Sequence, residues 1–365
     1  NRTHLLGQAA GLPVLARRRR LDVLHSLANG GPPITPGVAR VVTMLDLIWL
    51  HQGRAWGTRG AVRTMAVLTR VSARTAHRVI TISRAAKDDL VASFGLPPDK
   101  VDVAPLGVRV PDSVRRAPAD GVVLCVAQKR PYKNLGSLLR AVADLPDATL
   151  VLPGAPTQHE RELRDLATDL GVAERVHFPA WVSDDELDEL YASATCFVLP
   201  SLIEGFGLPV LEAMARDVPV ACSNRPALPE VAGGAALLFD PLDQAAVTDA
   251  VRRLLTDKSL RDDLVRRGGE RARELSWRRT AEATLAASNL ARPVHRPVRI
   301  LIARGYQVTP WELKPWEILP ADRFEVAYLR LARNWFDDSS VRLRRFPVKA
   351  LSSYLPRGRA GAAIA

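Results

Sequence analysis

The sequence predicts an α/β protein that is built on doubly wound parallel sheets and has more than one domain. Short runs rich in Val, Ile and Leu alternate with stretches of helical period along most of the 365 residues. The runs are apolar on both faces, which is typical of strands that lie in a parallel sheet between two layers of helices. Nine such strands are expected, at residues 38–43, 79–82, 101–104, 122–126, 149–152, 176–178, 196–199, 218–222 and 236–239.

Residues that favour helix starts mark several of the stretches between these strands. Ser183 stands three residues before Glu186, the spacing of a capping box in which hydroxyl and carboxylate bond each other's backbone N–H groups. Ser83 fits the N-cap of a helix over residues 85–94, and a proline in the first turn favours a helix over 208–215. The sequence therefore contains both strand-like apolar runs and helical stretches, as the α/β class requires.

Two proline-containing segments divide the chain. Residues 105–119 interrupt the alternation, and residues 291–297 follow a helical stretch without any pattern. We therefore expect a partial α/β unit at 1–110, a complete one at 111–292, and a linker with the opening of a further α/β unit at 293–365.

The charge is unevenly distributed along the chain. Residues 1–110 carry 16 Lys and Arg against 6 Asp and Glu, and residues 293–365 carry 13 against 6. The central region is therefore net acidic, although the whole chain carries +12. Basic regions favour anionic lipid, nucleic acid or phosphorylated substrates as partners. Nucleic acid is disfavoured, because aromatic residues make up 5% of the chain and none interleaves with the run Arg17 to Arg20.

Cysteine usage and hydropathy indicate a cytoplasmic protein. Cys125, Cys196 and Cys222 lie in apolar runs without metal-binding spacing, so we expect buried, reduced thiols. No run approaches the ~18 apolar residues that span a bilayer, and no signal peptide is visible. Peripheral attachment to the inner face of a membrane is a further expectation.

The strongest chemical signal follows the strand expected at 196–199 and opens a helix. The motif runs from Glu204 through Gly205-Phe206-Gly207-Leu208 to Glu212. Glycines let a backbone approach a ligand closely, and a helix start offers N–H groups to an anion or a sugar oxygen. Both carboxylates can face the crevice at the carboxyl ends of the strands and accept from vicinal sugar hydroxyls, at roughly 1.5–3 kcal/mol per bond. A capped helix with incidental Glu residues is the alternative.

A second signal follows the strand expected at 122–126. The segment Lys129-Arg130-Pro131-Tyr132-Lys133-Asn134 places three cations at a strand-to-helix turn, where they can clamp a diphosphate. A solvated basic loop is the alternative. Its place in the same unit as Glu204 favours phosphate binding.

From about His25 to Leu290 the chain resembles the family-4-type (glycosyl transferases group 1) retaining glycosyltransferases of the GT-B fold. The resemblance rests on the ordered pieces Asp46-Leu47, Ile82-Ser83, Pro105-Leu106-Gly107-Val108, Arg130 to Leu135, Val182 to Leu187, Glu204 to Glu212, and Leu228 to Gly233. The Glu-x7-Glu motif in this setting is highly specific. The resemblance implies two Rossmann-like domains that face a cleft, the N-terminal one incomplete, with a nucleoside-diphosphate sugar as the donor substrate.

The resemblance also assigns roles. It implies that Glu212 holds the ribose hydroxyls, that Arg130 and Lys133 bind the diphosphate, and that Glu204 meets the transferred sugar. The remaining donor-site candidates are Gly205, Phe206, Gly207, Leu208 and Trp181. For the exposed or buried state of Trp181 two interpretations stay open, stacking on the nucleotide base and packing in the core.

On the acceptor side, Asp46 joins Glu204 as a catalytic candidate. The resemblance implies retention of anomeric configuration, an oxocarbenium-like transition state, and no metal or other cofactor. The expected acceptor is a glycan or a polyprenyl- or other lipid-linked glycan, in surface polysaccharide or glycolipid synthesis. His25 and His51 either line the cleft or have structural roles.

Two positions depart from the family pattern. Leu45 stands where many relatives have His, and Ala127-Gln128 stand where many have Gly-Arg, a change that Lys129 or Arg130 can offset. Leu45 leaves open a different donor sugar or a degenerate unit that binds sugar nucleotide without turnover. A GT-B sugar-nucleotide epimerase is the other enzyme class. A dehydrogenase is disfavoured because the chain lacks a G-x-G-x-x-G motif.

The tail resembles the opening of a second enzyme of the same kind. Strands are expected at 298–303 and 324–329, and the segment from Thr309 to Glu317 would form an acceptor-side loop. We therefore expect an internal piece of a tandem glycosyltransferase. A circularly permuted single enzyme is the alternative.

Four arginines in the first region recur at helical spacing. Arg59, Arg63, Arg70 and Arg74 fall within about 60° of one another at ~100° per residue. This basic stripe is either a solvated helix face or a docking site for anionic lipid headgroups or a polyprenyl-phosphate acceptor.

Overall fold

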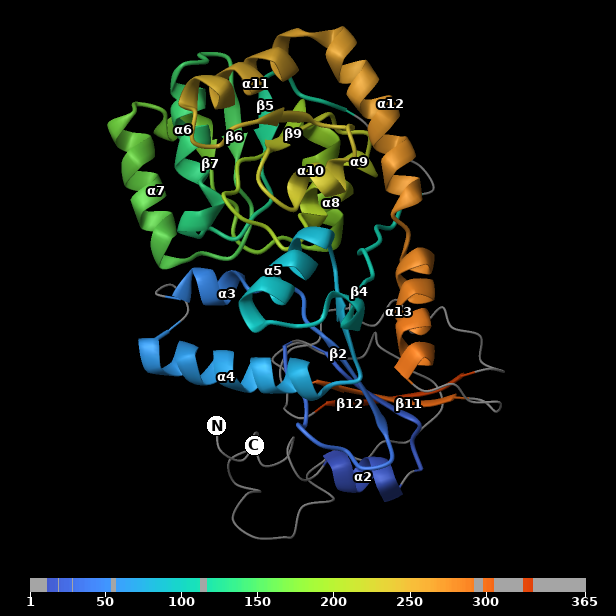
Figure 1. Ribbon diagram of the computed structural model, residues 1–365. Coiled ribbons are helices and arrows are strands. Elements are labelled where there is room, and N and C mark those ends of the chain that lie inside the picture. The colour runs from blue at the N-terminus through green and yellow to red at the C-terminus, as the bar shows by residue number, and fades with distance from the viewer. Residues whose placement is uncertain are drawn as a thin grey trace. The chain divides into compact units, whose positions relative to one another are not determined.

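The computed structural model describes residues 12–18, 20–27, 29–53, 57–111, 117–291, 298–304 and 324–330. The chain forms two compact units (Figure 1). Unit 1 combines Asn1–Pro105 with Trp277–Ala365, and unit 2 is Leu106–Ser276. Within the described ranges, each unit contains one six-stranded sheet, and every strand pair in both sheets is parallel. The predicted α/β class with two parallel sheets is confirmed.

The sheet of unit 1 has the order β12-β11-β1-β2-β3-β4. Its strands are β1 (Val23–Ser26), β2 (Ala39–Thr43), β3 (Arg78–Thr81), β4 (Val101–Val103), β11 (Val298–Arg304) and β12 (Phe324–Arg330). All but β1 match a predicted strand to within two residues. β1 was not among the predicted strands, because its four residues include His25 and Ser26 and therefore show no apolar run.

The tail strands belong to this sheet, which corrects the expected division of the chain. β11 pairs with β1 from Val23–Ile300 to Ser26–Ala303. Ile300 and Ile302 are fully buried in one cluster with Val23. The described strands of this region, β11 and β12, therefore belong to the sheet of unit 1 and not to a third unit, because β11 is buried against the open side of β1. The helix α13 (Trp277–Ala291) packs on β2, β3 and β4 and likewise belongs to unit 1, not to 111–292. The loop expected at 309–317 lies outside the described residues.

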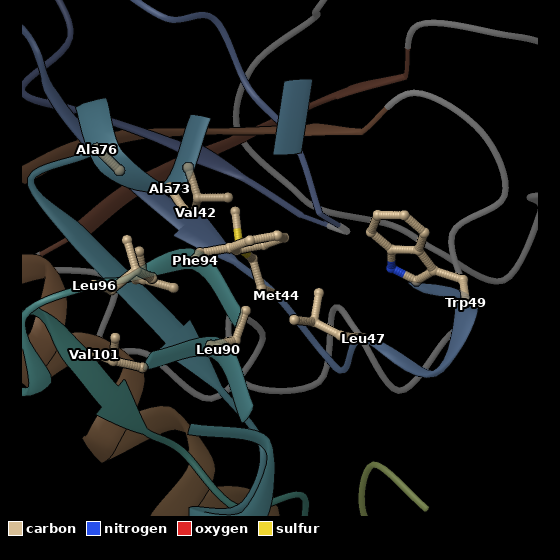
Figure 2. Packing of buried hydrophobic residues seen from close by; sticks show 11 residues of the cluster. Val42, Met44, Leu47, Trp49, Ala73, Ala76, Leu90, Phe94, Leu96 and Val101 are labelled. Carbon is tan, nitrogen blue, oxygen red and sulfur yellow. The ribbon is translucent and has the colours of Figure 1, made fainter. Parts of the chain in front are cut away.

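Three helices of unit 1 cover a second apolar cluster: α3 (Ile48–His51), α4 (Arg59–Thr75) and α5 (Arg84–Phe94). Unit 1 also contains α2 (Leu12–Arg18). Ser83 caps α5 as predicted, since its hydroxyl accepts from the N–H of Ala86 at 3.0 Å. Figure 2 shows Met44 from the end of β2 beside Leu90 and Phe94 of α5, with Leu96 completing this side of the core.

The sheet of unit 2 has the order β10-β9-β8-β5-β6-β7. Its strands are β5 (Val122–Leu124), β6 (Thr149–Val151), β7 (Val176–His177), β8 (Cys196–Leu199), β9 (Val220–Ser223) and β10 (Leu237–Phe239). The chain builds β5, β6 and β7 in one direction and then returns to build β8, β9 and β10 in the other. The strand order therefore reverses between β5 and β8. Open α/β sheets bind ligands at the carboxyl ends of the strands at such a point.

The helices of unit 2 are α6 (Leu135–Ala143), α7 (Gln158–Asp169), α8 (Asp184–Ser193), α9 (Leu208–Met214), α10 (Leu228–Ala232), α11 (Gln244–Thr256) and α12 (Lys258–Glu274). The capping box predicted at Ser183 and Glu186 is present at the start of α8. Cys125, Cys196 and Cys222 are free and buried, as predicted. None of the described helices is both long and apolar enough to cross a bilayer.

Candidate functional site

The two loops that the sequence singled out meet where the strand order of unit 2 reverses. One follows β5 and the other follows β8. The ammonium Nζ of Lys133 lies 2.6 Å from Oε1 of Glu204, and the hydroxyl of Ser201 donates to the same oxygen at 2.7 Å. The side chains of Lys133 and Glu204 are 13% and 9% exposed. The structure therefore joins the two predicted donor-binding loops through one nearly buried ion pair.

The charge of Lys133 is stabilised within this pair. Burial lowers the pKa of Lys133, but the attraction of Glu204 and the hydrogen bond to it more than offset the burial. The net effect raises the pKa above its ordinary value, so Lys133 remains a cation at neutral pH. Lys133 therefore supplies a fixed cation at the reversal of strand order, and its contact with a diphosphate stays a prediction.

Backbone contacts between the loops hold this geometry. The N–H of Leu202 donates to the carbonyl of Tyr132 at 2.9 Å, and the N–H of Glu204 donates to the carbonyl of Pro226 at 3.2 Å. Gly207 adopts a φ of +99°, and a Cβ at this position would lie 2.4 Å from a methyl carbon of Leu228. The positive φ strongly favours glycine at 207, and a Cβ would also force the Leu228 side chain to move. The predicted close approach of this backbone to a ligand stays a prediction.

Glu212 lies on α9, and most of its side chain is shielded from solvent. The hydroxyl of Tyr191 donates to its Oε2 at 3.2 Å, and the guanidinium of Arg216 stacks over the Tyr191 ring at 4.9 Å. Burial raises the pKa of Glu212, although Arg216 and Tyr191 both act to lower it. The site therefore holds a carboxylate with little solvation, which is suited to accept from ligand hydroxyls.

The cations of the basic loop after β5 have different partners. Lys129 is fully buried and donates to the carbonyl of Gly154 at 2.6 Å, with Glu160 at 3.2 Å. The expected clamp of three cations is therefore wrong for Lys129, because the β6 and α7 side of the unit holds its ammonium group. Arg130 is half-buried, and its Nε donates to Oε1 of Gln128 at 3.1 Å. Arg130 and Lys133 remain the two candidates for phosphate.

Trp181 lies in the segment between β7 and α8 and is 75% exposed. Core packing, one of its two interpretations, is therefore wrong. The other interpretation, stacking on a planar group, stays a prediction.

The candidates of unit 1 have local structural roles. Asp46 follows β2, and its Oδ1 accepts from the N–H of Ile48 at 3.0 Å, at the start of α3. Nε2 of His25 lies 2.7 Å from the Thr43 hydroxyl in the sheet, and burial lowers the pKa of His25 to about 3. His51 pairs with Asp89 at 2.8 Å. The buried His25 therefore has a structural role, whereas a place for the exposed His51 or for Asp46 in a site stays a prediction.

Sequence reasoning missed two contributors to the donor side. Ser201 is fully buried and orients Glu204, and Tyr191 is fully buried and orients Glu212. Ser201 stands three residues before Glu204, so its proximity was a signal that could have been used. Tyr191 comes from α8, and no sequence signal ties it to α9.

Comparison with known proteins supports the family resemblance that the sequence motifs indicated. The chain matches the family described as "Glycosyltransferase Family 4" over residues 1–110 and the family described as "Glycosyl transferases group 1" over residues 111–271. It is 32% identical to the O-antigen chain mannosyltransferase B of Escherichia coli, over 69% of this chain and 70% of that protein. It is also 32% identical to the MMP alpha-(1->4)-mannosyltransferase of Mycolicibacterium hassiacum, over 75% of this chain and 72% of that protein.

Among solved structures, the chain is similar in fold to WaaG, a glycosyltransferase involved in lipopolysaccharide biosynthesis. The TM-score is 0.61 at 18% identity, and the similarity covers 78% of this chain and 81% of WaaG. At this identity the similarity concerns the fold alone.

Proposed function

This chain belongs to the group 1 glycosyltransferases, and we propose that it moves a hexose from a nucleoside-diphosphate sugar to a glycan or lipid-linked acceptor in cell-surface glycan synthesis. One observation carries the proposal: the buried pair of Lys133 and Glu204 at the reversal of strand order in unit 2. This pair brings a fixed cation for the diphosphate next to a carboxylate for the sugar.

The donor would be held by groups from three loops. Lys133 and Arg130 would neutralise the diphosphate, and Glu212 would accept from the ribose hydroxyls. The exposed ring of Trp181 would stack on the base. Glu204 and the backbone of Phe206 and Gly207 would contact the hexose.

The chemistry follows from where charge develops. The bond between the anomeric carbon and the diphosphate breaks, and the diphosphate leaves with the electron pair. The cations of the basic loop stabilise the leaving group, so the proposed reaction needs no metal ion. The acceptor hydroxyl attacks the same face and its proton passes to the leaving phosphate, which retains the anomeric configuration.

The named relatives refine the proposal. The two similar curated proteins are mannosyltransferases by name, which favours mannose as the transferred hexose. Nucleotide sugars are made in the cytosol, so we propose that the chain acts on the cytosolic side of the membrane. Asp46 remains the proposed catalytic partner on the acceptor side.

Calorimetric titration of the full chain with UDP-, GDP- and ADP-sugars tests the donor site. We expect micromolar binding of one nucleotide, and its loss in Lys133→Ala and in Glu212→Ala. Lys258→Ala is a matched control, because Lys258 pairs with Asp262 on an exposed face of α12. Binding that is unchanged in both site variants would refute the proposed site.

Transfer to acceptor is measured separately. Leu45, one of the two departures from the family pattern, motivates the second candidate, a unit that binds sugar nucleotide without turnover. Nucleotide-sugar binding without release of nucleoside diphosphate in the presence of lipid-linked acceptors would favour that candidate over the transferase.

A further inference from the structure

The helix α4 distributes its apolar residues in an unusual way. Its inner face packs on the second core cluster of unit 1: Ala73 belongs to that cluster, Val62 and Ala66 pack against it, and Thr69 and Ser72 are buried. Four of its five larger apolar residues point outward. Met65, Val67, Leu68 and Val71 are 41%, 61%, 45% and 42% exposed. They are four of the eleven large apolar side chains that are exposed in the described part of the chain.

This arrangement reverses the pattern of an ordinary surface helix. Such a helix buries its large apolar residues and exposes polar ones. Val67, Leu68 and Val71 lie within about 100° of one another on the helix, at ~100° per residue. Contiguous exposed apolar residues on one helix mark a surface that binds a membrane or a partner protein.

The charge of α4 identifies what covers it. The helix contains four arginines and no Asp or Glu. Arg70 and Arg74 both donate through Nε to the carbonyl of Phe94, at 3.3 and 3.2 Å, so the predicted basic stripe is partly structural. Arg59 and Arg63 are exposed and form no ion pair with the described residues. They lie beside Val67 on the helix surface.

We propose that α4 docks on an anionic membrane surface, with Val67, Leu68 and Val71 entering the headgroup region and Arg59 and Arg63 contacting lipid phosphates. An apolar stripe flanked by arginines is the pattern of a helix that lies in the plane of the interface. A second copy of the chain would bring arginines against arginines across a symmetric contact, which disfavours self-association through this face. The inference does not depend on the donor site.

Vesicle co-sedimentation of the full chain tests the proposal. We expect binding to vesicles of phosphatidylcholine with phosphatidylglycerol, weak binding to phosphatidylcholine alone, and a decrease in binding as salt is raised. Arg59→Gln with Arg63→Gln should weaken binding by roughly 25-fold, at about fivefold per charge. Val67→Gln, Leu68→Gln and Val71→Gln together should weaken it by about tenfold or more.

Matched variants outside α4 provide the controls. Leu238→Gln with Leu242→Gln removes exposed apolar residues from unit 2, and Arg109→Gln with Arg253→Gln removes exposed charges. Neither should change vesicle binding. As an independent readout, Leu68→Cys labelled with an environment-sensitive dye should shift to shorter emission wavelength on anionic vesicles, and labelled Leu242→Cys should not. The native cysteines are buried and do not compete for the label.

Three outcomes would overturn the proposal. Equal binding to neutral and anionic vesicles would remove its electrostatic part. Unchanged binding in both α4 variants would place the membrane contact elsewhere. A change of oligomeric state in the apolar variant, seen by light scattering without loss of vesicle binding, would identify a second copy as the occupant. Donor binding by the same variants should remain unchanged, so failure here is distinct from failure of the proposed transferase.

Discussion

The ammonium of Lys133 and the carboxylate of Glu204 lie 2.6 Å apart at the reversal of strand order in unit 2. Each charge comes from a different loop, and each is nearly buried. Two such groups stabilise each other only as long as both are present, because the removal of one leaves the other desolvated and without its counter-charge.

A double-mutant cycle tests this dependence. Lys133→Met or Glu204→Gln alone should lower the free energy of unfolding by about 3 kcal/mol, and the double variant should lose less than the sum. Urea unfolding at pH 7 measures all four proteins. Additive losses would show that the two groups are not coupled.

Glu212→Gln should separate function from stability. Burial raises the pKa of Glu212, so the ionised form destabilises the native state at every pH above the raised value. At pH 7 the neutral amide should therefore unfold at an equal or higher temperature than the carboxylate. The difference should vanish below the ordinary pKa of a glutamate, where both are neutral. Donor affinity should fall by about 10- to 100-fold, as expected for the loss of a charge-assisted bond.

The measurements for Glu212→Gln are thermal unfolding at pH 7 and pH 4 and calorimetric donor titration. Glu270→Gln is a matched surface control, since Glu270 is exposed on α12 and bonds Arg266. A variant that is less stable at pH 7 and keeps donor affinity would contradict both parts of the prediction.

His25 should make unit 1 sensitive to acid. Burial lowers the pKa of His25 to about 3, whereas an unfolded histidine titrates near 6.5. The unfolded chain therefore binds the proton first, and stability falls as the pH drops below 6.5. Between pH 7 and pH 5 the contribution of this group should fall by about 2 kcal/mol. Urea unfolding of the wild type and of His25→Gln measures it, and equal slopes against pH would exclude His25 as the cause.

Much of the fold could be predicted from the sequence because most strands are continuous apolar runs. The strand at Cys196–Leu199 was predicted to the residue, and those around it to within two. The four-residue strand β1 was missed because a histidine and a serine interrupt its apolar character. His25 is accommodated because its Nε2 lies within hydrogen-bond distance of the Thr43 hydroxyl in the neighbouring strand. Contacts of this kind depend on sheet register, which local sequence does not encode.

The candidate site was predictable in its loops but not in its contacts. The positions of Lys133, Glu204 and Glu212 followed from motifs at strand ends. The inward turn of Lys129 did not, because its partner Glu160 comes from another helix. The same limit explains Tyr191. Spacing shows which residues share a loop, whereas three-dimensional packing decides which cation faces a ligand and which faces the core.

The tail strands β11 and β12 were likewise predicted as elements but not in their packing. Their pairing with the sheet of unit 1 can be tested. The sequence predicted β11 and β12 as strands but placed them in a separate unit, whereas Ile300 and Ile302 are buried in the core of unit 1. Ile302→Ala should therefore lower the stability of unit 1 by about 2–5 kcal/mol through lost burial and a cavity. Hydrogen exchange should quicken in β1 and β2 and stay unchanged in β8 and β9, because the two units have separate cores. Leu238→Ala, in the exposed part of β10, is the matched control and should change neither unit. If Ile302→Ala leaves the exchange of β1 unchanged, β11 does not complete this sheet in solution, and the separate unit expected from the sequence becomes the better description.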